Sequence, residues 1–359
     1  MASTEPVGTT RSVESDDATA EGSEDSAVEH RASAASDDGS SAGADPVLSL
    51  SDVTKAFGPE TAVDDVSLDV RSGELLTFLG PSGCGKTTTL RTIAGLEEPT
   101  EGEITLGDEV VAGDGAFVPP ERRDVGIVFQ NFALFPHLTV RENIAFGLAD
   151  ADAEESEARV DELLELVEMT DHGEKTPDQL SGGQKQRVAL ARSLAPEPEV
   201  LLLDEPFSNL DVRLRVEMRE EVRRILKEAG VTAVSVTHDQ EEALSISDRV
   251  AVMNDGEIEQ VGRPESVFER PESKFVASFL GRASFLEGEL RDGKVDTGIG
   301  RFDAVTLEGY DTVYDGAPVD VLVRPDDLRA TPASPELADG VVTSRQYVGP
   351  SFVYRVELD

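Results

Sequence analysis

The chain has 359 residues, 38% of them hydrophobic, and is therefore long enough for two domains that each bury a core. Its 73 acidic residues outnumber 32 basic residues, and the resulting formal net charge of −41 at pH 7 disfavours nucleic acid as a partner. No stretch reaches the roughly 18 apolar residues of a membrane-spanning helix. The N-terminus lacks the basic and apolar regions of a secretory signal. We therefore expect neither a membrane-spanning helix nor a signal peptide.

Charge and cysteine content indicate the environment of the protein more than its activity. Self-repulsion at this net charge would be relieved by salt, which favours the high-salt cytoplasm of a halophile such as a halophilic archaeon. An acidic protein of an ordinary cell is the alternative. Cys84 is the single cysteine, which excludes an intramolecular disulfide and suits a cytosolic setting.

The first 46 residues differ in composition from the rest of the chain. Residues 1–46 are mainly Ala, Ser, Asp, Glu, Gly and Thr, and they carry too few large apolar side chains to offset the entropy of ordering. We predict a disordered acidic tail there. Order is expected from Val47, where Val66, Leu68 and Val70 soon alternate with polar residues as in a half-buried strand.

The next elements alternate between strands and helices. Leu75–Leu79 is an apolar run of the buried, parallel-strand kind, and a helix is expected from Thr87 to Ala94. Helical spacing of apolar residues follows between Glu154 and Met169, and buried strands are expected at Val200–Leu203 and Thr232–Thr237. This order predicts an α/β domain with a mostly parallel sheet over residues 47–281. Short alternating stretches broken by Gly, Asp and Pro predict a small all-β domain over residues 282–359.

A glycine-rich loop lies between the predicted strand and helix at residues 75–94. It fits the pattern G-x-x-x-x-G-K-[ST], in which glycines let backbone N–H groups converge on phosphate oxygens at a helix N-terminus. Lys86 would reach the β- and γ-phosphates, and the Thr87 hydroxyl would ligate Mg²⁺. Cys84 fills a free position and has no expected catalytic role. The predicted nucleotide-binding residues of the loop are Gly80, Pro81, Ser82, Gly83, Cys84, Gly85, Lys86, Thr87 and Thr88.

Two adjacent carboxylates end the strand that begins at Val200. Ligands of open α/β sheets gather at the carboxyl ends of strands, so Asp204 and Glu205 are expected beside the phosphate loop. Asp204 would hold Mg²⁺, and Glu205 would polarise the attacking water.

Leu180-Ser181-Gly182-Gly183-Gln184 begins another predicted helix. Ser181 can cap it, and Gln184 three residues later can reach back. Two successive glycines in a first turn are unfavourable unless another group approaches the backbone.

With this motif about twenty residues before the Asp-Glu pair, the chain resembles the ABC ATPase family from Val47 to the C-terminus. The resemblance implies a P-loop NTPase cassette with helical and antiparallel β subdomains. It also implies that two copies sandwich two ATP molecules head to tail, with Ser181, Gly182, Gly183 and Gln184 contacting the nucleotide bound to the other copy.

The other family elements are placed by the same resemblance. Gln130 matches the glutamine that senses Mg²⁺ and the γ-phosphate. Ser208–Asp211 matches the loop that links the two sites, with Asp211 near the nucleotide. His238 matches the switch histidine, and Phe57 matches the aromatic residue that stacks on adenine. The predicted catalytic residues are thus Glu205, His238 and Gln130, and the predicted metal ligands are Thr87, Gln130 and Asp204.

Further segments resemble importers of iron(III), polyamines and sugars. Phe132–Phe146 is similar to the segment that receives a permease helix, although an ordinary loop with core aromatics is the alternative. The resemblance implies a peripheral subunit on the cytoplasmic face of the membrane that serves a permease and, indirectly, a solute-binding protein. Phe279–Leu286 and Tyr347–Ser351 look nearest to iron(III) importers, with polyamine or sugar import as the alternative.

Arg324-Pro325-Asp326 resembles a motif of the small β-barrel regulatory domain of these importers, the TOBE domain. Because the chain stops at Asp359 inside an expected strand, we expect that this barrel is incomplete. A non-transport ABC ATPase that acts on DNA or ribosomes is a remote alternative, since it would lack the C-terminal β domain and would have a polyanionic partner. A binding protein with a dead nucleotide site is disfavoured because every catalytic position is filled.

Overall fold

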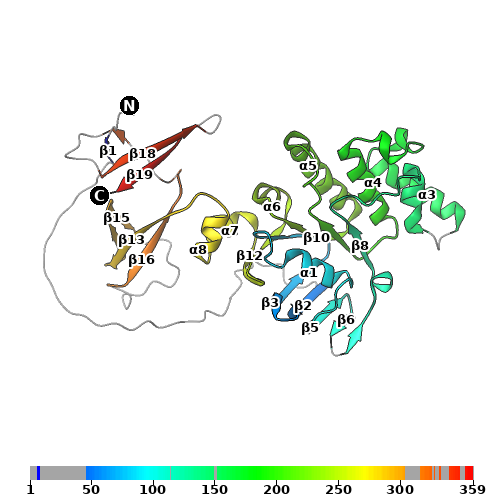
Figure 1. Cartoon of the computed structure of the whole chain (residues 1–359), viewed down its shortest axis with the longest axis horizontal. Coiled ribbons are helices and arrows are strands. Elements are labelled where there is room, and N and C mark those ends of the chain that lie inside the picture. Colours follow the sequence, from blue (N-terminus) through cyan, green and yellow to red (C-terminus); the bar gives the residue numbers. More distant parts are fainter. Residues whose placement is uncertain are drawn as a thin grey trace. The chain divides into compact units, whose positions relative to one another are not determined.

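The computed structural model describes residues 6–8, 46–113, 115–148, 152–303, 316–325, 327, 331–332, 339–347 and 352–358. Contacts divide the chain into two compact units, one of residues 35–276 and one that joins residues 1–34 to residues 277–359 (Figure 1). Of the tail predicted to be disordered, only Pro6–Gly8 and Pro46 are described; the remainder lies outside the described residues.

A six-stranded sheet organises the larger unit. Five of its strands are parallel and β12 is antiparallel to β11, which confirms the predicted mostly parallel sheet. In sheet order the strands are β12 (Glu257–Gly262), β11 (Arg249–Asn254), β4 (Leu75–Leu79), β10 (Thr232–Thr237), β9 (Val200–Asp204) and β8 (Val125–Val128).

A second, antiparallel sheet belongs to the same unit. Its order is β3 (Glu60–Val70), β2 (Leu48–Phe57), β5 (Glu101–Leu106), β6 (Glu109–Gly113) and β7 (Ala116–Phe117). The helices are α1 (Lys86–Ile93), α2 (Val140–Ala145), α3 (Ala153–Leu166), α4 (Gly182–Leu194), α5 (Val212–Ala229), α6 (Gln240–Ile246), α7 (Pro264–Glu269) and α8 (Lys274–Phe279). Short 3₁₀ turns occur at η1 (Pro120–Arg122), η2 (Phe146–Leu148), η3 (Thr170–His172) and η4 (Pro177–Gln179).

Two hydrophobic clusters cover the two faces of the parallel sheet. Successive side chains of a strand point to opposite faces. Leu201 and Leu203 therefore join a cluster with α2, α3, α4 and α5, while Leu202 joins a cluster with α1 and the antiparallel sheet. Burial on both faces explains why these strands read as continuous apolar runs. The sheet is thereby fixed as a rigid platform whose carboxyl edge carries the polar loops.

The described strands of the smaller unit form antiparallel sheets, as the all-β prediction expected. One has the order β15 (Gly300–Asp303), β14 (Lys294–Thr297), β13 (Ser284–Arg291) and β16 (Pro318–Val323). The other has the order β17 (Thr331–Pro332), β1 (Pro6–Gly8), β18 (Gly340–Tyr347) and β19 (Phe352–Leu358). Among the described helices of the chain, none is long and apolar enough to cross a membrane.

Candidate active site

The loop between β4 and α1 is shaped by close backbone contacts. A Cβ atom at Gly80 would lie 2.3 Å from the carbonyl oxygen of Met253, and one at Gly85 would lie 2.3 Å from that of Ala62. Gly85 also has φ +101°, a conformation that favours glycine. These positions accept no side chain, so the loop wraps tightly and α1 begins at its end, as the phosphate-binding prediction requires.

Lys86 lies inside this loop rather than in solvent. Its side chain is buried, and its ammonium group donates hydrogen bonds to the carbonyl oxygens of Gly80 and Pro81, each at 2.8 Å. The Sγ atom of Cys84 lies 3.6 Å away. These partners belong to the loop and carry no full negative charge, so the arrangement fits a phosphate group. Cys84 itself is buried in the cluster around α1, in agreement with the role of a filler.

The carboxylate pair ends β9. Burial raises the pKa of Asp204 above its ordinary value, the charge of Arg91 lowers it, and Glu205 raises it further. A cation bound beside Asp204 would lower its pKa, because positive charge favours the ionised carboxylate. Glu205 takes φ +45°, and its N–H donates to the carbonyl of Val236 on β10 at 3.0 Å. Its side chain thereby leaves the strand direction and lies at the carboxyl edge of the sheet.

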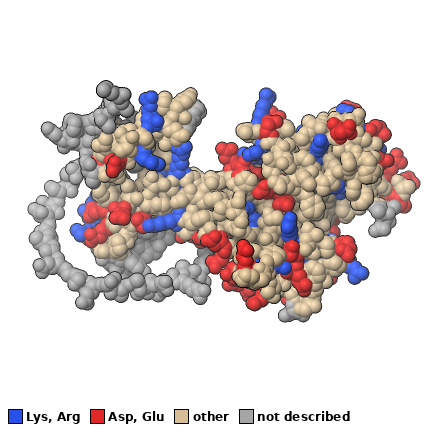
Figure 2. All heavy atoms as spheres, in the orientation of Figure 1, with Lys and Arg blue, Asp and Glu red and all other residues tan. Residues whose placement is uncertain are grey.

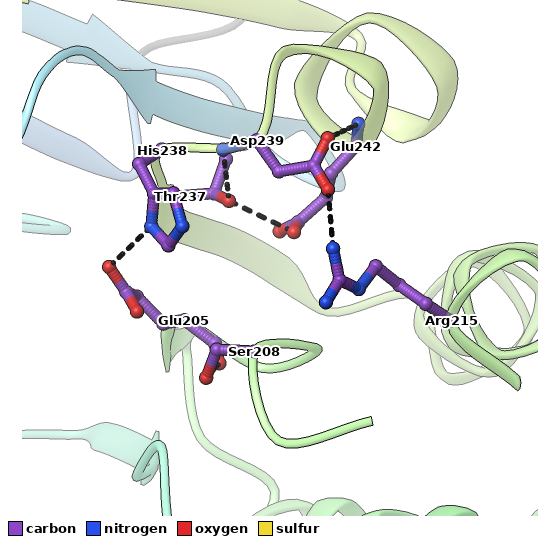
Figure 3. Close-up of a pocket in the computed structure, with 7 residues that line it drawn as sticks. All are labelled: Glu205, Ser208, Arg215, Thr237, His238, Asp239 and Glu242. Carbon is purple, nitrogen blue, oxygen red and sulfur yellow. Dashed lines mark hydrogen bonds and ion pairs between the residues drawn. The ribbon is translucent and has the colours of Figure 1, made fainter. Parts of the chain in front are cut away.

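Both carboxylate oxygens of Glu205 have partners among the predicted catalytic residues. The side-chain amide of Gln130, just beyond β8, lies 3.0 Å from Oε2. Nδ1 of His238, just beyond β10, lies 2.9 Å from Oε1 (Figure 3). An ionised carboxylate can only accept hydrogen bonds, so His238 donates to Glu205 from its Nδ1–H. Two side chains predicted from separate motifs thus meet at the carboxylate of a third.

Two residues that hold this cluster were not assigned a role there from the sequence. The Gln130 amide also donates to Ser208 Oγ at 3.1 Å, and Ser208 Oγ donates to the Glu205 carbonyl at 2.9 Å. Asn209 donates to the Gln130 carbonyl at 2.6 Å. Polar residues in the turn directly after the carboxylate pair are the signal that could have indicated them.

A pocket of about 70 Å³ lies beside Glu205 and His238. Figure 3 shows that its lining side chains come from the ends of β9 and β10 and from α5 and α6. Its lining residues are Glu205, Ser208, Arg215, Thr237, His238, Asp239 and Glu242.

The Ser181–Gln184 motif forms the start of α4 as predicted. The Gln184 N–H donates to Ser181 Oγ at 3.3 Å, and the Ser181 N–H donates to Gln184 Oε1 at 2.9 Å. A Cβ atom at Gly183 would lie 3.0 Å from Sδ of Met218, and one at Gly182 would lie 3.0 Å from the Leu210 side chain. Side chains of α5 and of the loop before it therefore pack closely against the backbone of these two glycines.

Gln184 has a further partner that the sequence did not indicate. Its Nε2 lies 3.0 Å from Nε2 of His172, on η3. Throughout the described ranges, no hydrogen bond joins Ser181 or Gln184 to Lys86, Glu205 or His238. The motif is thus preorganised at the start of α4 by its own contacts and by His172.

Two other predicted nucleotide contacts lie at different positions in the unit. Phe57, at the end of β2, has 47% of its surface exposed, and the Lys55 ammonium lies 4.7 Å from its ring centroid. An exposed ring beside a cation could stack on a flat ligand. Asp211 caps α5, where it accepts from the Leu214 N–H at 3.0 Å.

The predicted docking segment combines buried and exposed aromatic rings. Phe132 is buried in the core, whereas Phe146 has 58% of its surface exposed and packs against Phe135, with 4.4 Å between the ring centroids and 46° between the ring planes. Arg192 of α4 donates to the carbonyls of Phe132 and Ala133 at 3.0 Å and 2.7 Å. The prediction of a docking surface therefore applies to the exposed part, because Phe132 belongs to the core.

Comparison with known proteins gives consistent matches. The ABC transporter family matches residues 63–208, and the TOBE domain matches residues 321–359. The spermidine/putrescine import ATP-binding protein PotA of Rubrobacter xylanophilus is 48% identical over 313 residues, which cover 85% of this chain and 82% of that protein. The trehalose/maltose import ATP-binding protein MalK of Thermococcus litoralis is 49% identical over 290 residues, 78% of each chain.

Solved structures agree with this fold. The cbiO1 protein of Clostridium perfringens, part of the ABC transporter complex cbiONQ, matches with a TM-score of 0.59 at 30% identity and covers 64% of this chain and 92% of its own. A dimeric ATP-binding cassette in a post-hydrolysis state, bound to ADP and Pi, matches with a TM-score of 0.52 at 34% identity, covering 60% of this chain and 98% of its own. With its phosphate loop, its held carboxylate and its TOBE domain, this chain belongs to the ATP-hydrolysing subunits of ABC importers.

Proposed function

We propose that the chain drives the import of a polyamine through a separate permease on the cytoplasmic face of the membrane. Relatives named for spermidine/putrescine import support this reading, and the trehalose/maltose relative makes sugar import the second candidate. Iron(III), the first expectation from the sequence, has no support among these relatives, whose names favour the polyamine alternative. A solute-binding protein would deliver the cargo to the permease, so this subunit would not contact the solute.

Glu205 is the general base of ATP hydrolysis in this proposal. The observation that carries the assignment is the position of its carboxylate, held at both oxygens by Gln130 and His238 at the edge that bears the phosphate loop. Held this way, the carboxylate is oriented to accept a proton from water. Lys86 binds the phosphates, and the His238 ring orients the Glu205 carboxylate.

The predicted Mg²⁺ ligands form a suitable donor set. Thr87 supplies a hydroxyl, Gln130 a carbonyl oxygen and Asp204 a carboxylate, all hard oxygen donors of the kind Mg²⁺ binds together with phosphate and water. Over the described part of the chain, no group of three or more His, Cys, Asp or Glu side chains offers a competing metal site. When bound, Mg²⁺ would neutralise charge on the phosphates.

A second copy of the chain would complete the site. Within one chain, Lys86 contacts the phosphate loop and Ser181 caps α4. A relative with this fold is a dimer bound to ADP and Pi. In the proposed head-to-tail dimer, residues 181–184 of one copy contact the γ-phosphate held by the other copy's loop, and Phe57 stacks on adenine.

Substitution of Glu205 tests the hydrolytic assignment. We expect Glu205→Gln to bind ATP as the wild type does, because the side chain keeps its size and hydrogen-bonding reach. Hydrolysis should slow by about 10²–10⁴-fold, the range that general-base catalysis contributes. ATP binding and single-turnover hydrolysis are measured on purified protein, and a wild-type hydrolysis rate in the variant would exclude Glu205 as the base.

Uptake assays test the proposed cargo. A strain lacking this chain should lose ATP-dependent uptake of labelled spermidine, and the wild-type chain should restore it whereas Glu205→Gln should not. Labelled maltose measured in parallel distinguishes the second candidate. Loss of maltose uptake with spermidine uptake intact would replace the polyamine proposal by the sugar proposal.

A further inference from the structure

Asp239 directly follows the switch histidine and joins three parts of the fold. Its N–H donates to Thr237 Oγ1 at 3.1 Å, and its Oδ1 accepts from the Glu242 N–H at 3.1 Å, which caps α6. Its Oδ2 accepts from Arg215 at 3.0 Å and from Arg219 at 2.8 Å. The turn that carries His238 is thus fixed to α6 by backbone groups and to α5 by two guanidinium groups.

The ion pairs at Asp239 are partly shielded from water. The Asp239 side chain is 20% exposed, that of Arg215 is 28% exposed and that of Arg219 is 7% exposed. Burial raises the pKa of Asp239, but the Glu242 N–H and the charges of Arg219 and Arg215 outweigh it and leave the pKa below its ordinary value. Because partly buried, charge-assisted contacts are stronger than exposed ones, this cluster can hold its geometry.

Arg215 also connects this cluster to the loop between β9 and α5. Arg215 lies one turn after the Asp211 cap, and its Nη2 lies 3.4 Å from the Leu210 carbonyl oxygen. The same loop contains Ser208, which contacts Gln130 and the Glu205 carbonyl. Both sides of the Glu205 carboxylate are therefore reached from the segment between Ser208 and Arg215. One route runs through Ser208 and Gln130. The other runs through Arg215, Asp239 and His238 (Figure 3).

We propose that Arg215 is a positioning residue for hydrolysis, which holds Asp239 so that His238 faces Glu205. The proposal rests on the assignment of Glu205 and His238 above. It implies that a displacement of residues 208–211 changes the His238–Glu205 contact, so that this loop and the switch histidine act together. Arg215 contacts neither nucleotide nor water in this scheme and acts only through His238.

The alternative is that the pair merely stabilises the fold, and the chain offers a matched control. Arg223 lies on the same helix and pairs with Asp248 at 3.1 Å, an acceptor whose other partners are Lys227 and the Leu75 N–H. This pair also anchors α5 but does not lie beside His238. Arg215→Gln is preferable to a change at Asp239, since it leaves Asp239 paired with Arg219 and creates no unpaired buried arginine.

The experiment compares Arg215→Gln, Arg215→Lys and Arg223→Gln in the full chain. For Arg215→Gln we expect kcat to fall about tenfold, because a misplaced catalytic group loses alignment, while the KM for ATP changes by less than about twofold. Arg215→Lys should recover most of the rate, since it keeps the positive charge. Arg223→Gln should keep wild-type kcat even if its melting temperature falls as much as that of Arg215→Gln.

Coupling to His238 separates a positioning role from a structural one. Under single-turnover conditions, adding Arg215→Gln to His238→Ala should slow hydrolysis no further, because Arg215 acts through the ring that is gone. The proposal would be overturned if Arg215→Gln slowed hydrolysis by the His238→Ala variant as much as it slows the wild type. Equal kcat values for Arg215→Gln and Arg223→Gln would overturn it as well. If His238→Ala itself hydrolyses at the wild-type rate, the assignment of the switch histidine fails, and with it the basis for Arg215.

Discussion

Glu242 carries a buried carboxyl group beside the pocket that contains His238. The Thr237 hydroxyl donates to its Oε2 at 2.9 Å, and no partner for Oε1 occurs among the residues that the structure describes. Burial raises the pKa of Glu242 to about 8; the Thr237 hydrogen bond and the charges of Arg219 and Arg215 lower it, and Asp239 raises it. The carboxyl is therefore mostly protonated at pH 7.

This raised pKa makes stability depend on pH in a defined window. Since the folded state binds the proton more tightly than the unfolded state, the contribution of Glu242 is fully present below its ordinary pKa. It is lost as pH rises toward about 8. Glu242→Gln imitates the neutral form and carries no proton to lose. We expect the difference in melting temperature, variant minus wild type, to increase between pH 5.5 and 8. The increase should be at most about 2–4 °C per pH unit.

Scanning calorimetry at several pH values checks this expectation. The difference between the two proteins should level off above pH 8, where the carboxyl is ionised in both states. A difference that stays constant from pH 5.5 to 8 would show that Glu242 titrates normally in the folded protein.

At the residue scale, the sequence predicted the groups that recur at fixed spacings beside recognisable strands. Lys86, Asp204 and Glu205 follow buried runs, so their place at the sheet edge could be deduced. The contacts of Arg215 with Asp239 and of His172 with Gln184 could not, because each depends on how helices pack across the fold. Asp239 could be predicted as a helix cap, but nothing local indicates its arginine partners.

At the scale of elements, the segment from Phe132 to Phe146 offers an exposed ring on a fixed support. Asn143 is buried and its side chain bonds the carbonyls of Phe135, Leu138 and Thr139, while Thr139 caps α2. The segment is thus held by its own polar contacts as well as by Arg192. Such preorganisation suits a docking surface, because little entropy is lost on binding.

Phe146→Ser tests this surface. We expect the ATPase rate of the isolated chain to stay within about twofold of wild type, since the ring contributes no group to the site. Stimulation by the permease and solute uptake should fall severalfold, because an exposed aromatic anchor is lost. Phe117→Ser on β7 is the control, as this ring is also exposed but belongs to the antiparallel sheet. Equal uptake in the two variants would place the permease contact elsewhere.

The elements themselves were predictable to different degrees. The parallel strands were evident because burial on both faces makes them continuously apolar. The helix expected from Glu154 to Met169 ends at Leu166 instead, where Val167 leaves helical geometry and Glu168 takes φ +55°. Apolar periodicity continued past this point because Val167 and Met169 stay buried in the same cluster outside the helix. Burial and helix conformation are separate properties, and the sequence pattern reports only the first.

At the scale of the whole molecule, acidic residues greatly outnumber basic ones. Figure 2 shows them spread over the visible face of the larger unit rather than gathered in one patch. Pairs such as Arg224 with Glu221 and Glu228 neutralise some of them, but 32 basic residues cannot pair with 73 acidic ones. Repulsion among the excess carboxylates therefore outweighs the attraction within exposed pairs, each worth at most about 1 kcal/mol.

Salt should therefore stabilise the protein. The Debye length falls from about 10 Å at 0.1 M to about 3 Å at 1 M, which screens the repulsion. We expect the melting temperature to rise between these concentrations in KCl and in NaCl alike. A flat or falling curve would remove the support for a high-salt cytoplasm, and the charge would then need another explanation.

Assembly of two copies is the last property of the whole molecule to test. In the proposed dimer each site takes Lys86 from one copy and Ser181 from the other, so Lys86→Ala and Ser181→Arg homodimers should both be inactive. A mixed dimer combines both lesions in one site and leaves the other site intact. Mixing the two variants should therefore restore ATP hydrolysis, at about half the wild-type rate or less because the two sites are coupled.

A dimer whose copies each contain a complete site could not show this recovery, since every copy would carry its own defect. The permease should make the recovery clearest by holding the two copies together. Mixed dimers are verified by differential tagging before the rate is measured. Activity in the Ser181→Arg homodimer, or none in verified mixed dimers, would contradict the shared site. Ser181 is a cap of α4 as well, so a melting curve of Ser181→Arg must show that the helix is intact before its loss of activity is assigned to the missing contact.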